Sequence, residues 1–409
     1  MKKRITSVLL VLALCLTLLP TAALAADSNH TAADHDNTSK FTKLWVDTDN
    51  GNKLMKGGNV WTVDADSGYL MLEAGKYYLS TDLTLTDPIG IFGANVTLCL
   101  NGKTIKYTGT EASAILVDWD NRTSRNSGHL TLTDCSGNNA GTILGGQAMG
   151  VKIIGDSNLD MYGGTITGSS KGVDISNENT VFNMYGGVIT GNSGYGVYMT
   201  TGKFNMSGGE ITGNYGGGVF VGTASAFEVS GEVIKITDNT ANGKANNVHL
   251  YTGKTFTVMK SLKDGAKIGV TTEKIPSSES TVKIIASAFD SNYIESDMDG
   301  YKAQYISDSN GSRVVLAVDP EAHAKTCKNH SSSNGGTEFI PWTDAEARSQ
   351  NGSGKKASNS LPSKAGSYYL TGSVTLDAEW KPASGTTVLC LNGQTVTGVD
   401  GQMTITVTS

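Results

Sequence analysis

The sequence is poor in arginine, and its five arginines are Arg4, Arg122, Arg125, Arg313 and Arg348. A protein that follows a nucleic-acid backbone needs a stripe of basic side chains, whereas the formal net charge of this chain is −6. We therefore expect no nucleic-acid partner. Charged residues make up only 17% of the chain, while hydrophobic residues, at 38%, are enough to build a packed core.

Long apolar runs are also scarce, and one of them lies at the start of the chain. Residues 1–25 contain KKR at 2–4, an apolar run at 8–19 and ALA at 23–25, which is the pattern of a secretory signal peptide. No other segment approaches the roughly 18 consecutive apolar residues that a membrane-spanning helix requires. We expect a secreted or extracellular protein with no membrane span after signal cleavage. Any attachment to a cell surface would use a region outside this sequence.

Cysteine is rare, and four cysteines remain once Cys15 of the signal peptide is removed. Cys99 and Cys390 occupy the same place in two copies of the motif LCLNG, where apolar neighbours predict a small buried side chain. A Cys99–Cys135 bridge between stacked coils is the alternative that the sequence leaves open. No disulfide framework is indicated.

A zinc site is a further possibility, because His323, Cys327 and His330 have a spacing that suits metal ligands. A fourth ligand is missing from this set, and the corresponding segment of the first copy has no cysteine. We therefore expect no metal site and no cofactor.

Glycine, in contrast, is abundant, and many of the 50 glycines fall in a repeat of 22 or 23 residues. Apolar and polar residues alternate within each repeat, which predicts about three short strands with one buried face. Such a unit buries too little apolar surface to be stable alone, so successive repeats must stack. The recurring apolar residues form three columns: Met161, Met184, Met206 and Val229; Ile143, Ile166, Ile189, Ile211 and Ile234; and Val151, Val173, Val197, Val219 and Val248.

The glycine motifs of this repeat are GGTITG at 163–168, GGVITG at 186–191 and GGEITG at 208–213. With these motifs the chain resembles the right-handed, pectate-lyase-like parallel β-helix proteins that Gram-positive bacteria secrete or display on their surface. The resemblance covers about residues 68–270 and implies the handedness. We expect an all-β fold, a right-handed parallel β-helix in which Ile166, Ile189 and Ile211 are inward neighbours on adjacent coils. Asn192, Asn214 and Asn239 are expected to form an inward row of hydrogen-bonded amides.

A second, larger repeat relates residues 75–102 to residues 366–393, which lie 291 positions later. We expect a signal peptide at 1–25, an N-terminal segment and cap at 26–67, a β-helix unit with C-terminal strands at 68–320 and an incomplete second copy at 321–409. The second copy would expose apolar faces prepared for further coils, at Val374, Leu376, Val388 and Leu391. We expect either that the natural protein continues past Ser409 with more coils, or that this copy docks on the first unit and uses it as a template. Limited proteolysis is expected to cut at 331–336 and then to remove everything after the cut.

Catalytic side chains are not indicated. In β-helix enzymes of the fold that the chain resembles, acids from neighbouring coils converge on one outward column. Here the outward residues next to the valine column are Lys152, Asp174, Tyr198, Phe220 and His249, with a single carboxylate. Beside the methionine column, Asp160 and Glu228 lie three coils apart, about 14 Å at about 4.8 Å per coil, whereas glycoside hydrolysis needs about 5–9.5 Å. A lyase would use a calcium-binding acid cluster and a basic residue, and no arginine lies between 125 and 313.

Outward aromatic residues are the remaining signal. Tyr162, Tyr185, Tyr198 and Phe220 project from successive coils, and Tyr195 and Tyr215 lie on turns. Stacked rings about 4.8 Å apart offer a shallow platform for sugar rings. The predicted ligand-binding residues are Asp174, Tyr185, Tyr198, Tyr215 and Phe220.

These features favour a non-catalytic module, glycan-binding or adhesin-like, whose partner is a polysaccharide or a host or cell-surface glycan. Two alternatives stay open: a polysaccharide-degrading lyase or glycoside hydrolase with this fold, and a purely structural surface stalk.

Overall fold

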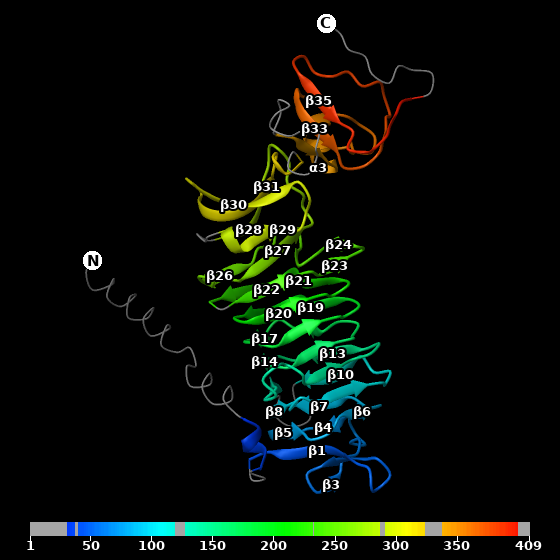
Figure 1. The fold of residues 1–409 in the computed structure, drawn as a ribbon, viewed down its shortest axis with the longest axis vertical. Coiled ribbons are helices and arrows are strands. Elements are labelled where there is room, and N and C mark those ends of the chain that lie inside the picture. Colours follow the sequence, from blue (N-terminus) through cyan, green and yellow to red (C-terminus); the bar gives the residue numbers. More distant parts are fainter. Residues whose placement is uncertain are drawn as a thin grey trace, which may run out of the picture.

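The computed structural model describes residues 31–36, 40–118, 127–231, 233–286, 291–323 and 338–399. The expected signal peptide, Cys327, His330 and the expected cleavage segment 331–336 lie outside these residues. The chain winds into an elongated stack of short strands, with the C-terminal elements at the far end (Figure 1). The predicted fold class, an all-β right-handed parallel β-helix, is confirmed. No helix within the described ranges is long and apolar enough to cross a membrane.

Three columns of parallel strands form the walls of the β-helix. Column A contains β4 (Leu70–Met71), β7 (Ile89–Phe92), β10 (Ser113–Asp118), β13 (Met149–Ile153), β16 (Val173–Ile175), the first parts of β19 (Tyr195–Met206) and β21 (Gly217–Ser230), β25 (Val248–Leu250) and the end of β27 (Lys267–Thr272). Column B contains β1 (Thr42–Asp47), β5 (Gly75–Leu79), β8 (Asn95–Cys99), β11 (His129–Thr133), β14 (Asn158–Met161), β17 (Val181–Met184), the last parts of β19 and β21, and β26 (Thr257–Lys260). Column C contains β6 (Leu83–Leu85), β9 (Thr104–Tyr107), β12 (Thr142–Leu144), β15 (Thr165–Thr167), β18 (Val188–Thr190), β20 (Gly209–Thr212), β22 (Ile234–Thr237) and the start of β27, followed by β29 (Ile294–Ser296).

The inward residues stack in the predicted register. Ile166 pairs with Ile189 and Ile189 with Ile211, and all three are fully buried, so this prediction is confirmed. The prediction that Ile234 continues this isoleucine column was wrong, because Ile211 pairs with Ile236 and not with Ile234. The turn before β22 is two residues longer than in the preceding coil. Since side chains alternate along a strand, a shift of two residues leaves the same face inward and the apolar pattern unchanged.

Four phenylalanines also stack inside the β-helix, which the sequence analysis did not predict. Phe182 and Phe204 lie 4.8 Å apart between ring centroids, Phe204 and Phe227 5.1 Å, and Phe227 and Phe256 5.7 Å. Each ring is essentially buried. Their burial adds large apolar contacts to the core behind column B.

The row of inward asparagines is confirmed and is longer than predicted. Asn192 Nδ2 donates to Asn214 Oδ1 over 2.8 Å, and Asn214 Nδ2 donates to Asn239 Oδ1 over 2.8 Å. The row continues through Asn247, whose Oδ1 accepts from Asn239 Nδ2 over 3.0 Å, to Asp297 at its end. Burial raises the pKa of the Asp297 carboxyl. We call these five residues the amide row; it satisfies polar groups at the turn between columns C and A.

Antiparallel elements close both ends of the first unit. At the N-terminal end, β1 pairs with β2 (Lys53–Lys56), and β2 pairs with β3 (Asn59–Val60), after the short helix η1 (Ala32–Asp36). A hairpin of β23 (Thr240–Ala241) and β24 (Lys244–Ala245) projects from the side of the stack. At the other end lies a sheet of β28 (Val282–Ile285), β31 (Gly311–Val318) and β30 (Tyr301–Asp308), with η2 (Ser291–Tyr293) between β28 and β30 in the chain.

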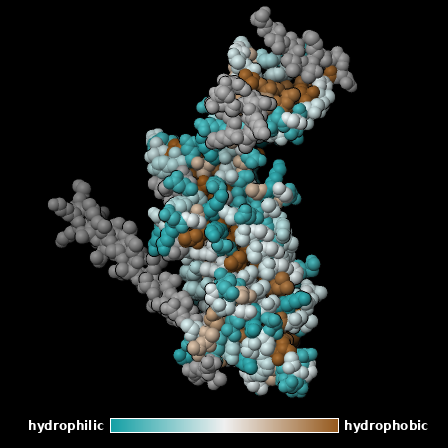
Figure 2. All heavy atoms as spheres, viewed as in Figure 1, coloured by the Kyte–Doolittle hydropathy of each residue, from teal (hydrophilic) through white to brown (hydrophobic). Residues whose placement is uncertain are grey.

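The second copy repeats the beginning of the first unit. Its elements are β32 (Ile340–Trp342), α3 (Asp344–Asn351), β33 (Gly366–Leu370), β34 (Val374–Thr375), β35 (Thr387–Cys390) and β36 (Val396–Thr397). The parallel set β32-β33-β35 corresponds to β1-β5-β8, and a separate small core lies around Trp342 and Leu370. Val374 and Leu376 are buried in it, whereas Val388 and Leu391 are exposed, and apolar atoms gather on this part of the surface (Figure 2).

Side chains hold the second copy against the first unit. The buried carboxylate of Glu346 accepts hydrogen bonds from the backbone N–H of Ser278 over 2.9 Å and from its hydroxyl over 2.7 Å. Glu279 also pairs with Lys364. Across the described ranges, no strand of the second copy pairs with a strand of the first. The second copy therefore docks on the first unit through side chains, and its strands do not extend the β-helix of the first unit.

Candidate functional site: an aromatic face on column A

Consecutive strands of column A place one outward side chain after another. Asp174 of β16 pairs in register with Tyr198 of β19, Tyr198 with Phe220 of β21, and Phe220 with His249 of β25. The flanking residues of each strand, such as Val197 and Val219, point into the core and are fully buried. Alternation along the strands therefore forces these four side chains onto one face. Together with Lys171 and Tyr195, we call them the column A face.

The rings on this face stack along the axis of the β-helix. Tyr198 and Phe220 lie 5.0 Å apart with planes inclined by 11°, and His249 lies 5.4 Å from Phe220 on the next coil. Lys171 Nζ lies 3.9 Å from the centroid of Tyr198. The faces of the Tyr198 ring thus meet Lys171 and Phe220. The position of Lys171 over one ring differs from the open platform that the sequence suggested.

Tyr195 and polar groups border the stacked rings. Its ring is tilted against both Tyr198 and Phe220, at centroid distances of 5.8 and 5.4 Å. Asn246 Nδ2 donates to the Tyr195 hydroxyl over 3.4 Å, and burial raises the pKa of that hydroxyl. The Asn246 Oδ1 lies 3.1 Å from His249 Nδ1. Hydroxyl, amide and imidazole groups therefore surround the apolar rings, as in a site that fixes the orientation of a polar ligand.

Asp174 lies at the base of the face and is largely buried, with 4% of its surface exposed. Its carboxylate accepts hydrogen bonds from Lys171 Nζ and from Ser176 Oγ, each over 3.2 Å. Lys171 thus contacts both the carboxylate and the Tyr198 ring. This arrangement makes Asp174 a positioning group for the lysine, because both of its oxygens are engaged below the surface.

The structure brings together three of the five predicted residues, Asp174, Tyr198 and Phe220. Tyr185 belongs to a different cluster, directly after strand β17 of column B. Its ring stacks on that of Tyr162, with 4.6 Å between the ring centroids. Burial, followed by the charge of Asp160, raises the pKa of Tyr185 to about 12. Tyr215 lies on the turn between columns C and A with 68% of its surface exposed. Among the described residues, no ring contact joins either tyrosine to the column A face.

Sequence reasoning left four members of this neighbourhood out of the predicted site: Lys171, Tyr195, Asn246 and His249. His249 was recognisable as outward from its place after Val248. Lys171, Tyr195 and Asn246 each lie three residues before an outward strand position, where a turn leads into a strand of column A. Turn conformation decides where such side chains point, and the repeat spacing alone does not reveal it.

The acids on column B are engaged in side-chain hydrogen bonds and ion pairs. Asp160 contacts His129 over 2.9 Å and accepts from Asn183 Nδ2 over 2.7 Å. Glu228 lies three coils away from Asp160 and forms an ion pair with Lys203 over 2.9 Å. The intervening outward positions carry the amides Asn183 and Asn205. The two carboxylates therefore do not form the close pair that glycoside hydrolysis requires.

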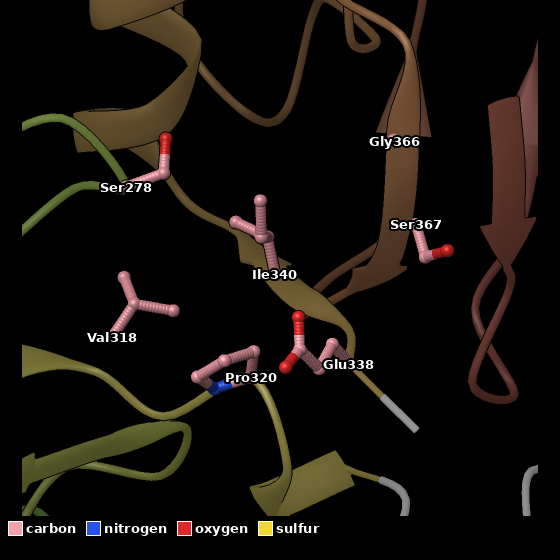
Figure 3. A pocket seen from close by; sticks show the side chains of 7 residues that line it. All are labelled: Ser278, Val318, Pro320, Glu338, Ile340, Gly366 and Ser367. Carbon is pink, nitrogen blue, oxygen red and sulfur yellow. The ribbon is translucent and has the colours of Figure 1, made fainter. Parts of the chain in front are cut away.

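A hollow with a volume of about 590 Å³ lies between the first unit and the second copy (Figure 3). It is lined by Ser278, Val318, Pro320, Glu338, Ile340, Gly366 and Ser367. Glu338 is the one ionisable side chain that the described residues contribute to this lining. These residues supply no pair of groups for acid–base chemistry, and we place the candidate site on column A.

No known protein family, curated protein or solved structure matches this chain.

Proposed function

We propose that the protein is a secreted or cell-surface module of the pectate-lyase-like kind found in Gram-positive bacteria, and that it binds a glycan on the column A face without cleaving it. Residues 1–25 would direct its export. The observation that carries this proposal is the concentration of Tyr195, Tyr198, Phe220 and His249 at one surface, on strands held in register by the stack.

The chemistry of the face suits a carbohydrate, whose rings have apolar C–H surfaces and hydroxyl-lined edges. The aromatic rings of Tyr198 and Phe220 supply apolar contact, and Asn246 and His249 supply hydrogen-bonding groups. Lys171 covers the outer face of Tyr198 in this structure. A sugar ring that displaces the ammonium group from Tyr198 gives up a cation–π contact worth about 0.5–1 kcal/mol, provided that Lys171 keeps its ion pair with the buried Asp174.

A structural stalk is the second candidate, because the same ring contacts also pack neighbouring coils together. In that case the aromatic side chains would contribute to stability and not to binding. The enzyme alternative lacks a supporting observation, since Asp174 is engaged by Lys171 and Ser176, and Asp160 and Glu228 are three coils apart.

A panel of pectins, other plant polysaccharides and mucin glycans separates these functions. We expect the full chain to be retained on at least one immobilised glycan, without new reducing ends or unsaturated products in solution. Product formation would establish an enzyme and contradict the proposal. Absence of retention on the whole panel would favour the stalk.

The double substitution Tyr198→Ala with Phe220→Ala is expected to weaken retention on that glycan at least tenfold. Because both side chains are outward, the free energy of unfolding should change by only about 1 kcal/mol. Affinity chromatography and thermal unfolding measure the two effects. The matched control is Tyr162→Ala with Tyr185→Ala, which removes a stacked pair of similar size from the other cluster. Equal loss of retention in both variants, or lost stability with unchanged retention, would contradict a binding role for column A.

A further inference from the structure

An imidazole and two thiols meet beside the ends of column B strands, toward the N-terminal end of the β-helix. Cys99 ends β8, Cys135 follows β11 on the next coil, and His35 lies in η1. The two sulfur atoms are 3.4 Å apart, and His35 Nε2 lies 4.0 Å from Cys135 Sγ. All three donor atoms lie within 4.8 Å of one another. His35 and Cys99 are buried, and Cys135 is half-buried.

These separations suit a metal ion bound by all three groups. With zinc–sulfur bonds of about 2.3 Å and zinc–nitrogen bonds of about 2.0–2.1 Å, tetrahedral coordination puts two sulfur ligands about 3.8 Å apart and a sulfur and a nitrogen about 3.6 Å apart. The observed donors are within a few tenths of an ångström of those values for the two measured pairs. A disulfide bond would instead require about 2.05 Å between the sulfur atoms.

Neighbouring side chains hold the imidazole in place. The His35 ring stacks on Tyr78 at 4.3 Å with planes inclined by 9°, and it meets the edge of Phe41 at 5.2 Å. This packing fixes the ring with Nε2 toward Cys135. Metal-binding histidines depend on such orientation by surrounding groups.

An amide oxygen is available beside the same cluster. Asn101 Nδ2 donates to the backbone oxygen of Leu79 over 2.9 Å, which orients the amide so that its Oδ1 lies 3.3 Å from Cys135 Sγ. Asn101 has a left-handed backbone conformation with φ of 51°, two residues after Cys99 at the end of β8. This turn brings its side chain back over the cluster.

The second copy builds the same neighbourhood again. His323 stacks on Tyr369 at 4.2 Å with an interplanar angle of 5°, and it meets the edge of Phe339 at 5.4 Å. Its Nε2 lies 3.3 Å from Cys390 Sγ. Asn392 Nδ2 donates to the backbone oxygen of Leu370 over 3.1 Å, as Asn101 does to Leu79. The recurrence shows that the imidazole, thiol and amide form one structural unit that is copied with the repeat.

We propose that His35, Cys99 and Cys135 bind a zinc ion, with the Asn101 amide oxygen completing or supporting the coordination. Thiolate and imidazole ligands favour zinc over magnesium and calcium, which prefer oxygen. The ion would link η1 to two successive coils and so hold the N-terminal segment on the end of the stack. The sequence analysis expected no metal site, and the set it considered and rejected, His323, Cys327 and His330, is not the one proposed here.

Cobalt titration of the reduced full chain tests the proposal directly, because a thiolate bound to Co²⁺ gives a near-ultraviolet charge-transfer band. We expect one cobalt ion per chain with this band, and its displacement by Zn²⁺. Cys135→Ser should abolish the band, and His35→Gln should weaken cobalt binding at least tenfold. The matched control is Cys390→Ser, which removes the thiol of the second copy and should leave the band in place.

Zinc should also raise the thermal unfolding midpoint of the wild-type chain and of Cys390→Ser, and it should have no such effect on Cys135→Ser. Circular dichroism before the titration checks that each variant keeps its β structure. The proposal is overturned if the wild-type chain gives no charge-transfer band, if the band persists in Cys135→Ser, or if His35→Gln binds cobalt as tightly as the wild type. It is equally overturned if peptide mapping of the unreduced protein finds Cys99 bonded to Cys135.

Discussion

Ile189→Asp is expected to disrupt the central coils and to lower the free energy of unfolding by more than about 4 kcal/mol. The side chain of Ile189 is fully buried between Ile166 and Ile211. Removing it forfeits about 1.5–3 kcal/mol of apolar burial, and an unpaired carboxylate left in the core adds about 3–5 kcal/mol. Urea unfolding followed by circular dichroism measures the loss.

The matched control is Thr190→Asp, one position further along β18, where the side chain points outward. The same charge placed there should change stability by only about 1 kcal/mol. Because each coil contacts only its neighbours, the stack need not unfold as one unit, so hydrogen exchange should show the damage centred on the coils around β18. Similar losses for both variants would contradict the alternating pattern of this column.

The spacing of apolar residues was sufficient to predict the β-helix, because stacking of coils requires like residues at like positions. Ile166, Ile189 and Ile211 follow this requirement without exception. The error at Ile234 has the same origin. Two isoleucines two positions apart both face inward, so the apolar pattern cannot tell which of them continues the column.

The candidate sites were harder to predict, because they depend on the direction of side chains and not on their period. Alternation identified Tyr198 and Phe220 as outward, but it could not show that Lys171 covers one ring face. His35 and Cys135 lie in a short 3-10 helix and a loop, where no repeat relates one coil to the next. The sequence left open that Cys99 and Cys135 meet on stacked coils, but the approach of His35 to them became visible only when η1 was placed in space.

Asn214→Ala is expected to lower the free energy of unfolding by at least about 4 kcal/mol, although it removes only a small polar side chain. The Oδ1 of Asn214 accepts from both the backbone N–H and the Nδ2 of Asn192, at 3.1 and 2.8 Å. Its Nδ2 donates to the backbone oxygen of Ile189 over 3.1 Å and to Asn239 Oδ1 over 2.8 Å. Asn192, Asn214 and Asn239 are fully buried, so water cannot replace these partners. Each buried group left without a partner costs about 1–3 kcal/mol.

Asn183→Ala is the matched control for this effect. Asn183 also belongs to a row of side chains that hydrogen-bond from coil to coil, since it donates to Asp160 and accepts from Asn205, each over 2.7 Å. It lies on the outward side of column B and is only partly buried, so water can take over part of its hydrogen bonding. The expected loss is about 0.5–1.5 kcal/mol. Urea unfolding of both variants measures the difference. Equal losses would show that the amide row is no more important than surface hydrogen bonds, whereas the expected contrast would identify its buried polar contacts as a main source of order between coils.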